Sequence, residues 1–428
     1  MVSKSTTVSR DILNERLTPA FAVFAGLGLW FLMFILAPVV PRWPQDFYPI
    51  GLFILCTFGL LAGFAIPEIM KVEFAPAVFD PEVFRSYFRL IFVLATVGLV
   101  AKLSDVFLIR GMSVSASAAE RDLTMRIAEP GPLSIVAAVL LPLGQATLLL
   151  AAIGKKLGIL PRIGAGVLSV SLLNPLVAAA FGSRSSLFLL AVEALAAALL
   201  LVPRITPRHV MLAGASALIL LVASSLIFAS RMEFLGMDYR MSVRYSVYTI
   251  TVPANADYLD LLDSAHGSIG PLLASAVSLL QYFIHGVFEF FYLVELKSEN
   301  FTYGDTIFFF VSKMTSYLTG GATALSTLEI DARNPRGGTF QSFYGPAYID
   351  FGQFVVLFCL VFGVCVGLVR RAVVSGNVYA FPLYVFLLMN LLIIPCVSGL
   401  LMYAGSISLM VYIGLWPLGT WWQRLRAS

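Results

Sequence analysis

The chain has 428 residues, of which 59% are hydrophobic and 12% are charged, with a formal net charge of +4. A soluble domain carries roughly 25% charged residues, so water could not solvate a folded chain of this composition. The mean hydropathy of +0.90 agrees with that conclusion. The sequence therefore predicts an integral membrane protein. No low-complexity tract or flexible linker interrupts it, so we predict a single membrane domain over residues 1–428.

Ten apolar runs are long enough to cross a bilayer as helices, because a span needs about 20 apolar residues. Only helices and closed barrels satisfy the backbone inside a membrane, and the predicted fold class is an all-α polytopic membrane protein. The predicted spans are residues 18–40, 48–69, 87–108, 132–153, 163–182, 185–203, 209–229, 351–369, 379–397 and 402–422. The first run is too long for a cleavable signal peptide, so we expect it to remain as a span.

Basic residues gather in alternate connections between these spans. Because Lys and Arg stay on the cytoplasmic side, both termini are predicted to be cytoplasmic and the number of spans to be even. The clusters are Lys4, Arg10 and Arg16; Lys71 and Arg85; Lys155, Lys156 and Arg162; Arg204 and Arg208; Arg370 and Arg371; Arg424 and Arg426.

The longest segment between predicted spans, residues 230–350, precedes the last three and is predicted to lie outside. It carries seven basic and twelve acidic residues over 231–350, so its arginines form local patches, and nucleic acid is not an expected partner. Its apolar piece, 269–294, could pair with 306–318 as two further spans, giving twelve. We favour an amphipathic or re-entrant segment on the outer face, with Gln281, His285 and Glu289 at helical spacing on one side.

Metal and disulfide chemistry is not expected from this sequence. The carboxylates of Asp257, Asp260 and Asp263 drift round a helix instead of converging, so we expect that segment to face water. None of the cysteines lies in a polar loop, which predicts neither a disulfide framework nor a zinc site. These cysteines are Cys56, Cys359, Cys365 and Cys396.

Four local features stand out along the chain. One feature is the long outer loop after the seventh predicted span, with QYFIHGVFEFFYL inside it. The others are an acidic-basic outer segment leading into GPLS, the GSRSSLFLL corner, and FYGPAYIDFG before a span. The four sequences lie at Gln281–Leu293, Ala118–Gly144, Gly182–Leu190 and Phe343–Gly352. Together with the order and hydropathy of the spans, these features resemble the Wzy-type polymerases of O-antigen, also called oligosaccharide repeat unit polymerases.

This resemblance implies a GT-C-like glycosyltransferase in the bacterial inner membrane, working on its periplasmic face. Its substrates would be oligosaccharide repeat units linked to undecaprenyl diphosphate, joined for O-antigen, capsule or exopolysaccharide synthesis. The growing chain would move onto the next lipid-linked unit, and undecaprenyl diphosphate would be released. The resemblance implies no cofactor, neither nucleotide sugar nor metal. Membrane lipids and a chain-length regulator are the other expected partners.

Arginines are the natural contacts for a diphosphate leaving group, because guanidinium groups bond phosphate oxygens in pairs and stay charged. Arg240 and Arg244 share a helix face and can contact one diphosphate. The alternative is a solvated pair at the bilayer surface that contacts lipid headgroups. Arg231 lies at a predicted membrane boundary, where it can also simply reach the surface. Arg184 sits in a tight apolar corner, where a charge needs a partner. Arg336 completes the candidate diphosphate-binding residues.

The candidate catalytic residues are His285, Glu289 and Asp350. His285 and Glu289 lie one turn apart, and such a pair can activate an imidazole as a general base, although packing is the commoner role for a lone histidine. Asp350 lies at the start of a predicted span, and its carboxylate could accept a hydrogen bond from a sugar hydroxyl. Tyr344 and Tyr348 could stack on sugar rings, or belong to the aromatic belt of the membrane interface.

Other functions remain open at this stage. A ligase that transfers the glycan to lipid A core has a similar long outer loop. A flippase for the same lipid-linked sugars would need charged groups in a central cavity, whereas the predicted spans are nearly free of charge. Lys102 and Asp105, three residues apart in the third span, are expected to pair with each other.

Overall fold

The computed structural model describes most of the chain. The described residues are 6–7, 17–74, 78–112, 131–180, 185–202, some positions between 206 and 222, 236, 238–267, 269–296, 301–319, 325, 327–336, 339, 341–400 and 403–427. Within them the fold is almost entirely helical. A two-residue pair of strands, β1 Thr6–Thr7 and β2 Val78–Phe79, is antiparallel.

Six described helices or continuous helical stretches are long and apolar enough to cross a membrane, and they confirm the polytopic class. They are Pro19–Leu36 (α1), Tyr48–Ile69 (α2), Pro81–Ile109 (α3, Pro81–Leu103, with the π-helix η2, Ser104–Ile109), Pro132–Lys156 (α5, Pro132–Leu140, and α6, Pro142–Lys156), Ile269–Glu295 (α12) and Tyr344–Val374 (α15, Tyr344–Phe351; η4, Gly352–Phe354; α16, Val355–Val374).

The remaining described helices are shorter or more polar. In the apolar part of the chain they are α7 Ala165–Ala180, α8 Ser185–Leu201, η5 Val378–Ala380, α17 Phe381–Leu392 and α18 Tyr403–Ala427. In the long connecting segment they are α10 Tyr239–Arg244, η3 Val247–Ile250, α11 Ala256–Ser264, α13 Phe309–Leu318 and α14 Thr327–Arg333. The predicted span 209–229 lies largely outside the described residues.

Helix α1 shows why these segments fold as they do. The Thr18 hydroxyl accepts the Phe21 N–H at 3.1 Å and caps the first turn, which would otherwise leave backbone donors unsatisfied. Large side chains such as Phe24 and Ile35 stay exposed, while Ala22 on another face is buried. An apolar surface of this kind needs lipid around it, because water would disfavour it.

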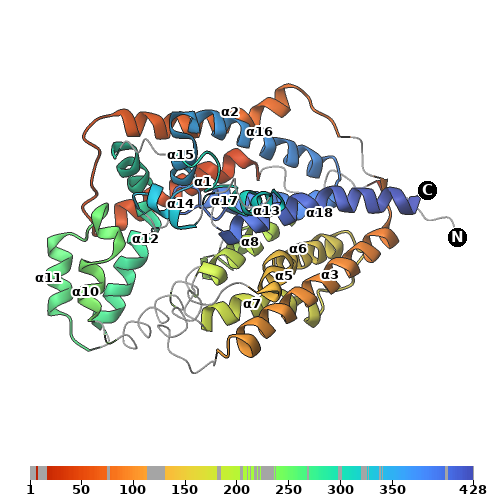
Figure 1. Cartoon of the computed structure of the whole chain (residues 1–428), viewed down its shortest axis with the longest axis horizontal. Helices are drawn as coiled ribbons and strands as arrows, with labels where there is room; N and C mark the ends of the chain where they lie inside the picture. Colours follow the sequence, from red (N-terminus) through yellow and green to blue (C-terminus); the bar gives the residue numbers. More distant parts are fainter. Residues whose placement is uncertain are drawn as a thin grey trace.

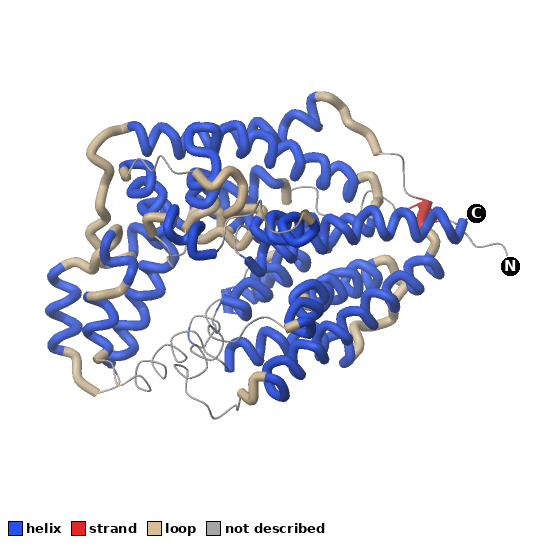
Figure 2. Tube along the Cα trace, viewed as in Figure 1, coloured by secondary structure: helices blue, strands red, loops and turns tan. Residues whose placement is uncertain are grey.

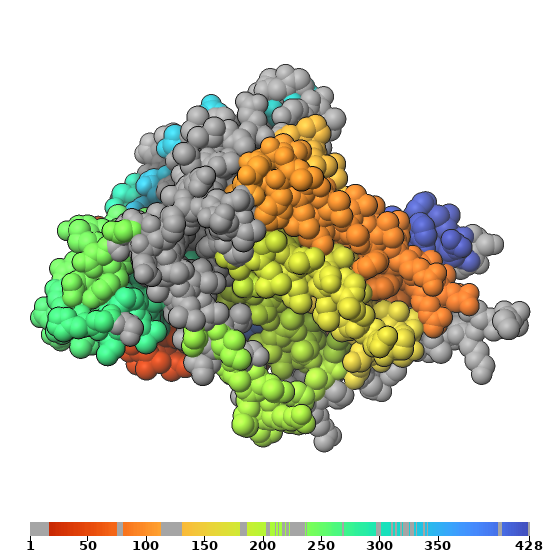
Figure 3. Space-filling model, turned by 90° about the horizontal axis from the view of Figure 1, so that it is seen from below, coloured from red at the N-terminus to blue at the C-terminus, as the bar shows by residue number. Residues whose placement is uncertain are grey.

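Helices α2 and α16 run side by side along one edge of the molecule (Figures 1 and 2). Glycines allow this close approach: a Cβ added at Gly63 would lie 2.8 Å from the Gly363 Cα. Small residues at such positions are the usual means of packing membrane helices, since lipid supplies no hydrophobic force between them. Helices α3, α6 and α7 form a second wall (Figure 3).

The contacts of α12 with the apolar helices gather at one end of the bundle, which we call the α12 end. The indole N–H of Trp30 in α1 donates to the Ile284 carbonyl at 3.1 Å. Phe53, near the start of α2, packs on Phe290 at 6.2 Å between ring centroids. Helix α12 is itself long and apolar enough to cross a membrane, so its placement as an amphipathic or re-entrant segment stays a prediction.

The polar helices α10 and α11 pack on α12 at this same end, whereas β1 and the last turns of α18 lie at the opposite end (Figure 1). Two backbone hydrogen bonds join the chain between η3 and α11 to the turn after α1. The Val40 N–H donates to the Pro253 carbonyl at 2.9 Å, and the Arg42 N–H donates to the Thr251 carbonyl at 2.8 Å. The long segment therefore folds back onto the bundle as a cap.

One predicted span ends earlier than expected. The predicted span 379–397 is helical only through Leu392, and residues 393–400 are buried but irregular. Pro395 has no N–H to continue the helix. Backbone hydrogen bonds to a distant segment satisfy part of this stretch. The Phe343 N–H donates to the Ile394 carbonyl, and the Ser398 N–H donates to the Gln341 carbonyl. Irregular backbone at membrane depth is tolerated where protein buries it or a cavity borders it.

Candidate functional site

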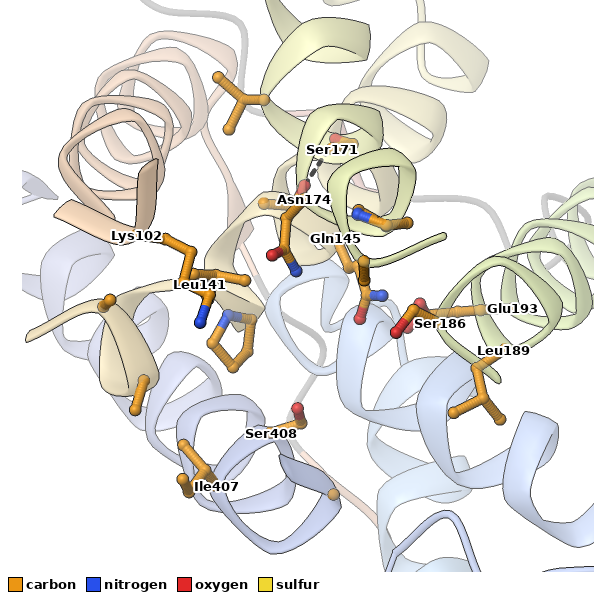
Figure 4. A pocket seen from close by; sticks show the side chains of 18 of the residues that line it. Lys102, Leu141, Gln145, Ser171, Asn174, Ser186, Leu189, Glu193, Ile407 and Ser408 are labelled. Atoms are coloured by element: carbon orange, nitrogen blue, oxygen red, sulfur yellow. Dashed lines mark hydrogen bonds between the residues drawn. The ribbon is translucent and has the colours of Figure 1, made fainter. Parts of the chain in front are cut away.

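A cavity of about 380 Å³ lies among the ends of α3, α5, α6, α7, α8, α17 and α18 (Figure 4). It adjoins the irregular segment through Gly399. Although apolar helices surround it, many of its lining side chains are polar. They are Lys102, Asp105, Arg110, Ser134, Gln145, Ser171, Asn174, Ser186, Glu193 and Ser408. Intramembrane polar groups are costly and mark functional sites, so this cavity is the leading candidate.

A closed hydrogen-bonded triangle forms one wall of the cavity. The Arg110 Nε donates to Asp105 Oδ2 at 3.1 Å, and its Nη2 donates to the Ser134 hydroxyl at 3.1 Å. That hydroxyl donates to Asp105 Oδ1 at 2.7 Å. The π-helical turn η2 brings Arg110 to Asp105, five residues earlier. Asp105 thus pairs with Arg110 and not with Lys102, which corrects the predicted pair.

Lys102 also lines the cavity. Among the described residues it makes no ion pair, and Figure 4 shows its side chain directed into the space. The amide side chains of Gln145 and Asn174 approach from other walls in the same view. An ammonium group with amides and hydroxyls around it can bind a phosphate and the hydroxyl groups of a sugar.

Glu193 lines the cavity from α8 and was not singled out by the sequence reasoning. It is 2% exposed, and the Tyr412 hydroxyl donates to its Oε1 at 3.3 Å. The Tyr412 ring packs edge-on against Phe386 at 5.0 Å, which fixes the phenol. The signal was present, since Glu193 is the one charged residue in the predicted span 185–203. The sequence does not show that Glu193 meets Lys102 and Asp105 at one cavity, because the three residues come from segments that only tertiary packing brings together.

Glu289 and Arg336 form a buried ion pair at the α12 end. The Arg336 Nε donates to Glu289 Oε1 at 2.6 Å, and the two side chains are 11% and 0% exposed. Arg336 also donates to the Val247 carbonyl at 2.7 Å. The pair thus holds together η3, α12 and the chain after α14.

His285 lies on the same buried face of α12. Its Nδ1 is 2.8 Å from the Tyr282 carbonyl and 3.2 Å from the Gln281 carbonyl. Since a carbonyl can only accept, Nδ1 carries the hydrogen. The ring packs against Tyr248 with centroids 4.5 Å apart. His285 and Glu289 are close along the helix as predicted, but Glu289 is engaged by Arg336, and neither residue lines the cavity.

Arg240 and Arg244 come together as predicted, against a carboxylate of the cap. Arg244 pairs with Asp263, whose other oxygen lies 3.8 Å from the Arg240 Nε. Arg240 also donates to the Asp263 and Ala265 carbonyls at 3.1 and 3.3 Å. Both guanidinium groups remain about one-third exposed. Asp263 thus serves the two arginines, and the described residues contain no metal-binding cluster of carboxylates, histidines or cysteines.

Asp350 is fully buried and fastens a loop. Its carboxylate accepts the Thr302 hydroxyl and the N–H groups of Thr306 and Ile307, at 3.0 and 2.8 Å for the two backbone donors. These bonds fold residues 302–307 over the end of α15. With its oxygens occupied, Asp350 is positioned as a structural clamp, and it does not line the cavity.

The predicted sugar-binding tyrosines lie in the core. Tyr344 is fully buried, and its hydroxyl is 3.0 Å from the Thr57 hydroxyl. Tyr348 is 6% exposed and packs edge-on against Phe290 at 6.0 Å. Neither ring presents a free face for stacking. The other candidates, Arg184 and Arg231, and the acidic-basic part of the outer segment before residue 131 lie outside the described residues.

Comparison with known proteins adds no family to this picture. No family model, no curated protein and no solved structure matches the chain. What is established is a polytopic, helical membrane protein with a polar cavity among its apolar helices, capped at one end by the long connecting segment.

Proposed function

We propose that the protein is a glycosyltransferase of the bacterial inner membrane that polymerises lipid-linked oligosaccharide units on the periplasmic face. The donor is a glycan on undecaprenyl diphosphate, and the acceptor is the next lipid-linked repeat unit. The products are a glycan longer by one unit and free undecaprenyl diphosphate. The reaction forms O-antigen, capsule or exopolysaccharide, and a GT-C-like arrangement carries it.

The observation that supports this proposal most directly is the polar cavity within an apolar bundle. A lipid-linked sugar has a hydrocarbon tail that must stay in the bilayer and a polar head that must leave it. The bundle offers exposed apolar faces for the tail, and the cavity offers Lys102 with amides and hydroxyls for the head. Polar groups in such a site fix orientation and specificity. The resemblance in the sequence agrees with this chemistry.

Lys102 is the residue that we assign to the diphosphate. Its ammonium is a compact positive charge that can neutralise the leaving group without a metal ion. Arg110 lies beside it, but its guanidinium is committed in part to Asp105 and Ser134. The two exposed arginines of the cap, Arg240 and Arg244, can attract the anionic head before it enters the bundle.

A reconstitution assay tests this function. Purified protein in liposomes receives synthetic undecaprenyl-diphosphate-linked repeat units, and the products are separated by glycan length. We expect a ladder of longer glycans and release of undecaprenyl diphosphate in equal number to the bonds formed. We expect Lys102→Met to reduce the initial rate by tenfold or more, with Lys71→Met as a control in a connection. A wild-type protein that forms no ladder from any such donor contradicts the proposal.

A flippase for the same lipid-linked sugars is the second candidate, and the structure strengthens it. Lys102, Asp105 and Glu193 gather at one cavity inside the apolar helices, which is the feature expected of a transport pathway. A flippase would move a fluorescent lipid-linked sugar across the liposome without lengthening it. A ligase would instead require a lipid A core acceptor in the same assay.

A further inference from the structure

A polymerase needs a group that removes the proton from the attacking hydroxyl, and the cavity contains two described carboxylates, Asp105 and Glu193. Both oxygens of Asp105 accept hydrogen bonds, one from Arg110 and one from Ser134. Both oxygens of Asp105 are therefore already engaged within the protein. Glu193 is held differently. Tyr412 donates to its Oε1, and no described residue donates to its Oε2.

The candidates suggested by the sequence lie elsewhere. Asp350 has its carboxylate occupied by Thr302 and by two backbone N–H groups. Glu289 is paired with Arg336. Neither of them, nor His285, is among the residues that line the cavity.

Glu193 also has the right setting on its own helix. Ser186, Leu189 and Glu193 all line the cavity, and their spacing of three and four residues places them on one face of α8. At 1.5 Å per residue, Glu193 lies about 12 Å along the axis from the first residue of the helix. Ser186, near that helix end, and the deeper Glu193 thus share one space (Figure 4).

We propose that Glu193 is the general base of the polymerisation, with Tyr412 as the residue that positions it. This inference rests on the proposed function and names the proton acceptor within it. The acceptor sugar hydroxyl approaches the free Oε2, and its oxygen forms a bond to the anomeric carbon of the donor. The bond from that carbon to the diphosphate oxygen breaks, and the diphosphate leaves with the electron pair. The hydroxyl proton passes to the Glu193 carboxylate.

The apolar packing around Tyr412 serves this role. One oxygen of Glu193 is fixed by the phenol, so the other keeps a constant direction. A base that is oriented in this way loses less entropy when the acceptor arrives.

The test is the variant Glu193→Gln in the liposome assay, since the amide keeps the shape but is no base. General-base catalysis contributes about 10²–10⁴-fold to rate, so kcat should fall at least 100-fold while KM for the acceptor changes by less than threefold. Glu193→Asp should recover part of the activity. Asp260→Asn, on exposed α11, is the matched loss of a carboxylate and should leave both constants unchanged.

Tyr412→Phe provides the second variant. It should fold as the wild type does, because only one hydroxyl is removed, and kcat should fall about three- to tenfold with KM unchanged. Should Glu193→Gln not fold, an unchanged kcat in Tyr412→Phe overturns the inference. A Glu193→Gln protein with normal kcat overturns it as well, while the ladder made by the wild type still supports the proposed function. Absence of a ladder from the wild type contradicts the function itself.

Discussion

The pair of Arg336 and Glu289 is more buried than the ion pairs that Arg240 and Arg244 make with Asp263. Removing one partner leaves the other charge buried and uncompensated, which typically costs about 3–5 kcal/mol. We therefore expect Arg336→Met to lower the free energy of unfolding by about 3 kcal/mol. The double variant Arg336→Met with Glu289→Met should regain most of this lost free energy of unfolding, because no unpaired charge then remains buried at the site. Unfolding in detergent, followed by circular dichroism, measures both.

Arg424→Met is the control for that pair, because this arginine is exposed in the last turns of α18. A surface change of this kind should stay within about 0.5 kcal/mol. If the double variant is no more stable than Arg336→Met, the two residues do not act as a pair, and the assignment of this contact as the fastening of the cap is wrong.

Asp350 offers a choice between the role suggested by the sequence and the role shown by its contacts. Asp350→Asn replaces an acceptor-only carboxylate by an amide, so at least one donor of the loop 302–307 loses its partner. We expect a loss of about 1–3 kcal/mol in the free energy of unfolding, with turnover per folded molecule kept within threefold. Thr302→Val, which removes the opposing hydroxyl, should act in the same direction. Unchanged stability with lost turnover would instead support a catalytic Asp350.

At the scale of elements, the glycine contact between α2 and α16 controls how closely these helices pack. Overpacking costs typically about 1–3 kcal/mol, and here the neighbouring atoms are backbone that cannot move aside. Gly363→Leu should lower the melting temperature in detergent by several degrees. Gly28→Leu, where an added Cβ meets nothing within 4 Å, is the matched control and should leave it unchanged. Equal melting temperatures for the two variants would show that α2 and α16 do not pack in this way.

Helix type and rough position could be predicted from periodicity and apolar length, and α1, α2 and α3 agree with the predicted spans in most of their residues. The end of α17 could not, because composition does not reveal that residues 393–400 find hydrogen-bond partners near Gln341 and Phe343. The cavity could not be predicted either, because its lining residues are also distant from one another in the sequence. Glu193 and Lys102 are 91 positions apart in the sequence, and tertiary packing alone brings them to one space.

At the scale of the whole molecule, the fold of the described residues places the cap at one end of the bundle and β1 with the last turns of α18 at the other (Figure 1). The distribution of basic residues predicts that residue 375 is cytoplasmic and residue 260 periplasmic. Ser375→Cys should therefore react with a membrane-impermeant maleimide only after the cells are opened, whereas Asp260→Cys should react in intact spheroplasts. The reverse result, or labelling of both from one side, contradicts the predicted ten-span arrangement. The protein without added cysteines gives the background.

The sequence predicts a site built from polar residues, but the described residues among those that it proposes do not line the cavity. Arginines, carboxylates and tyrosines of the long segment were the expected site, since polar residues outside the spans are easily recognised in sequence. The structure uses several of them to hold the cap, as Glu289, Arg336 and Asp350 show. The cavity instead draws on isolated polar residues of separate apolar helices, such as Lys102 and Glu193, and their sequence does not show that these residues meet.

The length profile of the surface glycan in a strain lacking this gene tests the central claim most directly. We predict that long chains collapse to single repeat units attached to their usual acceptor, because export and attachment continue while polymerisation stops. Complementation with the wild type should restore the long chains, and Lys102→Met should not. A glycan of normal length in the deletion strain would contradict the account. Complete loss of surface glycan would contradict it in favour of the flippase or the ligase.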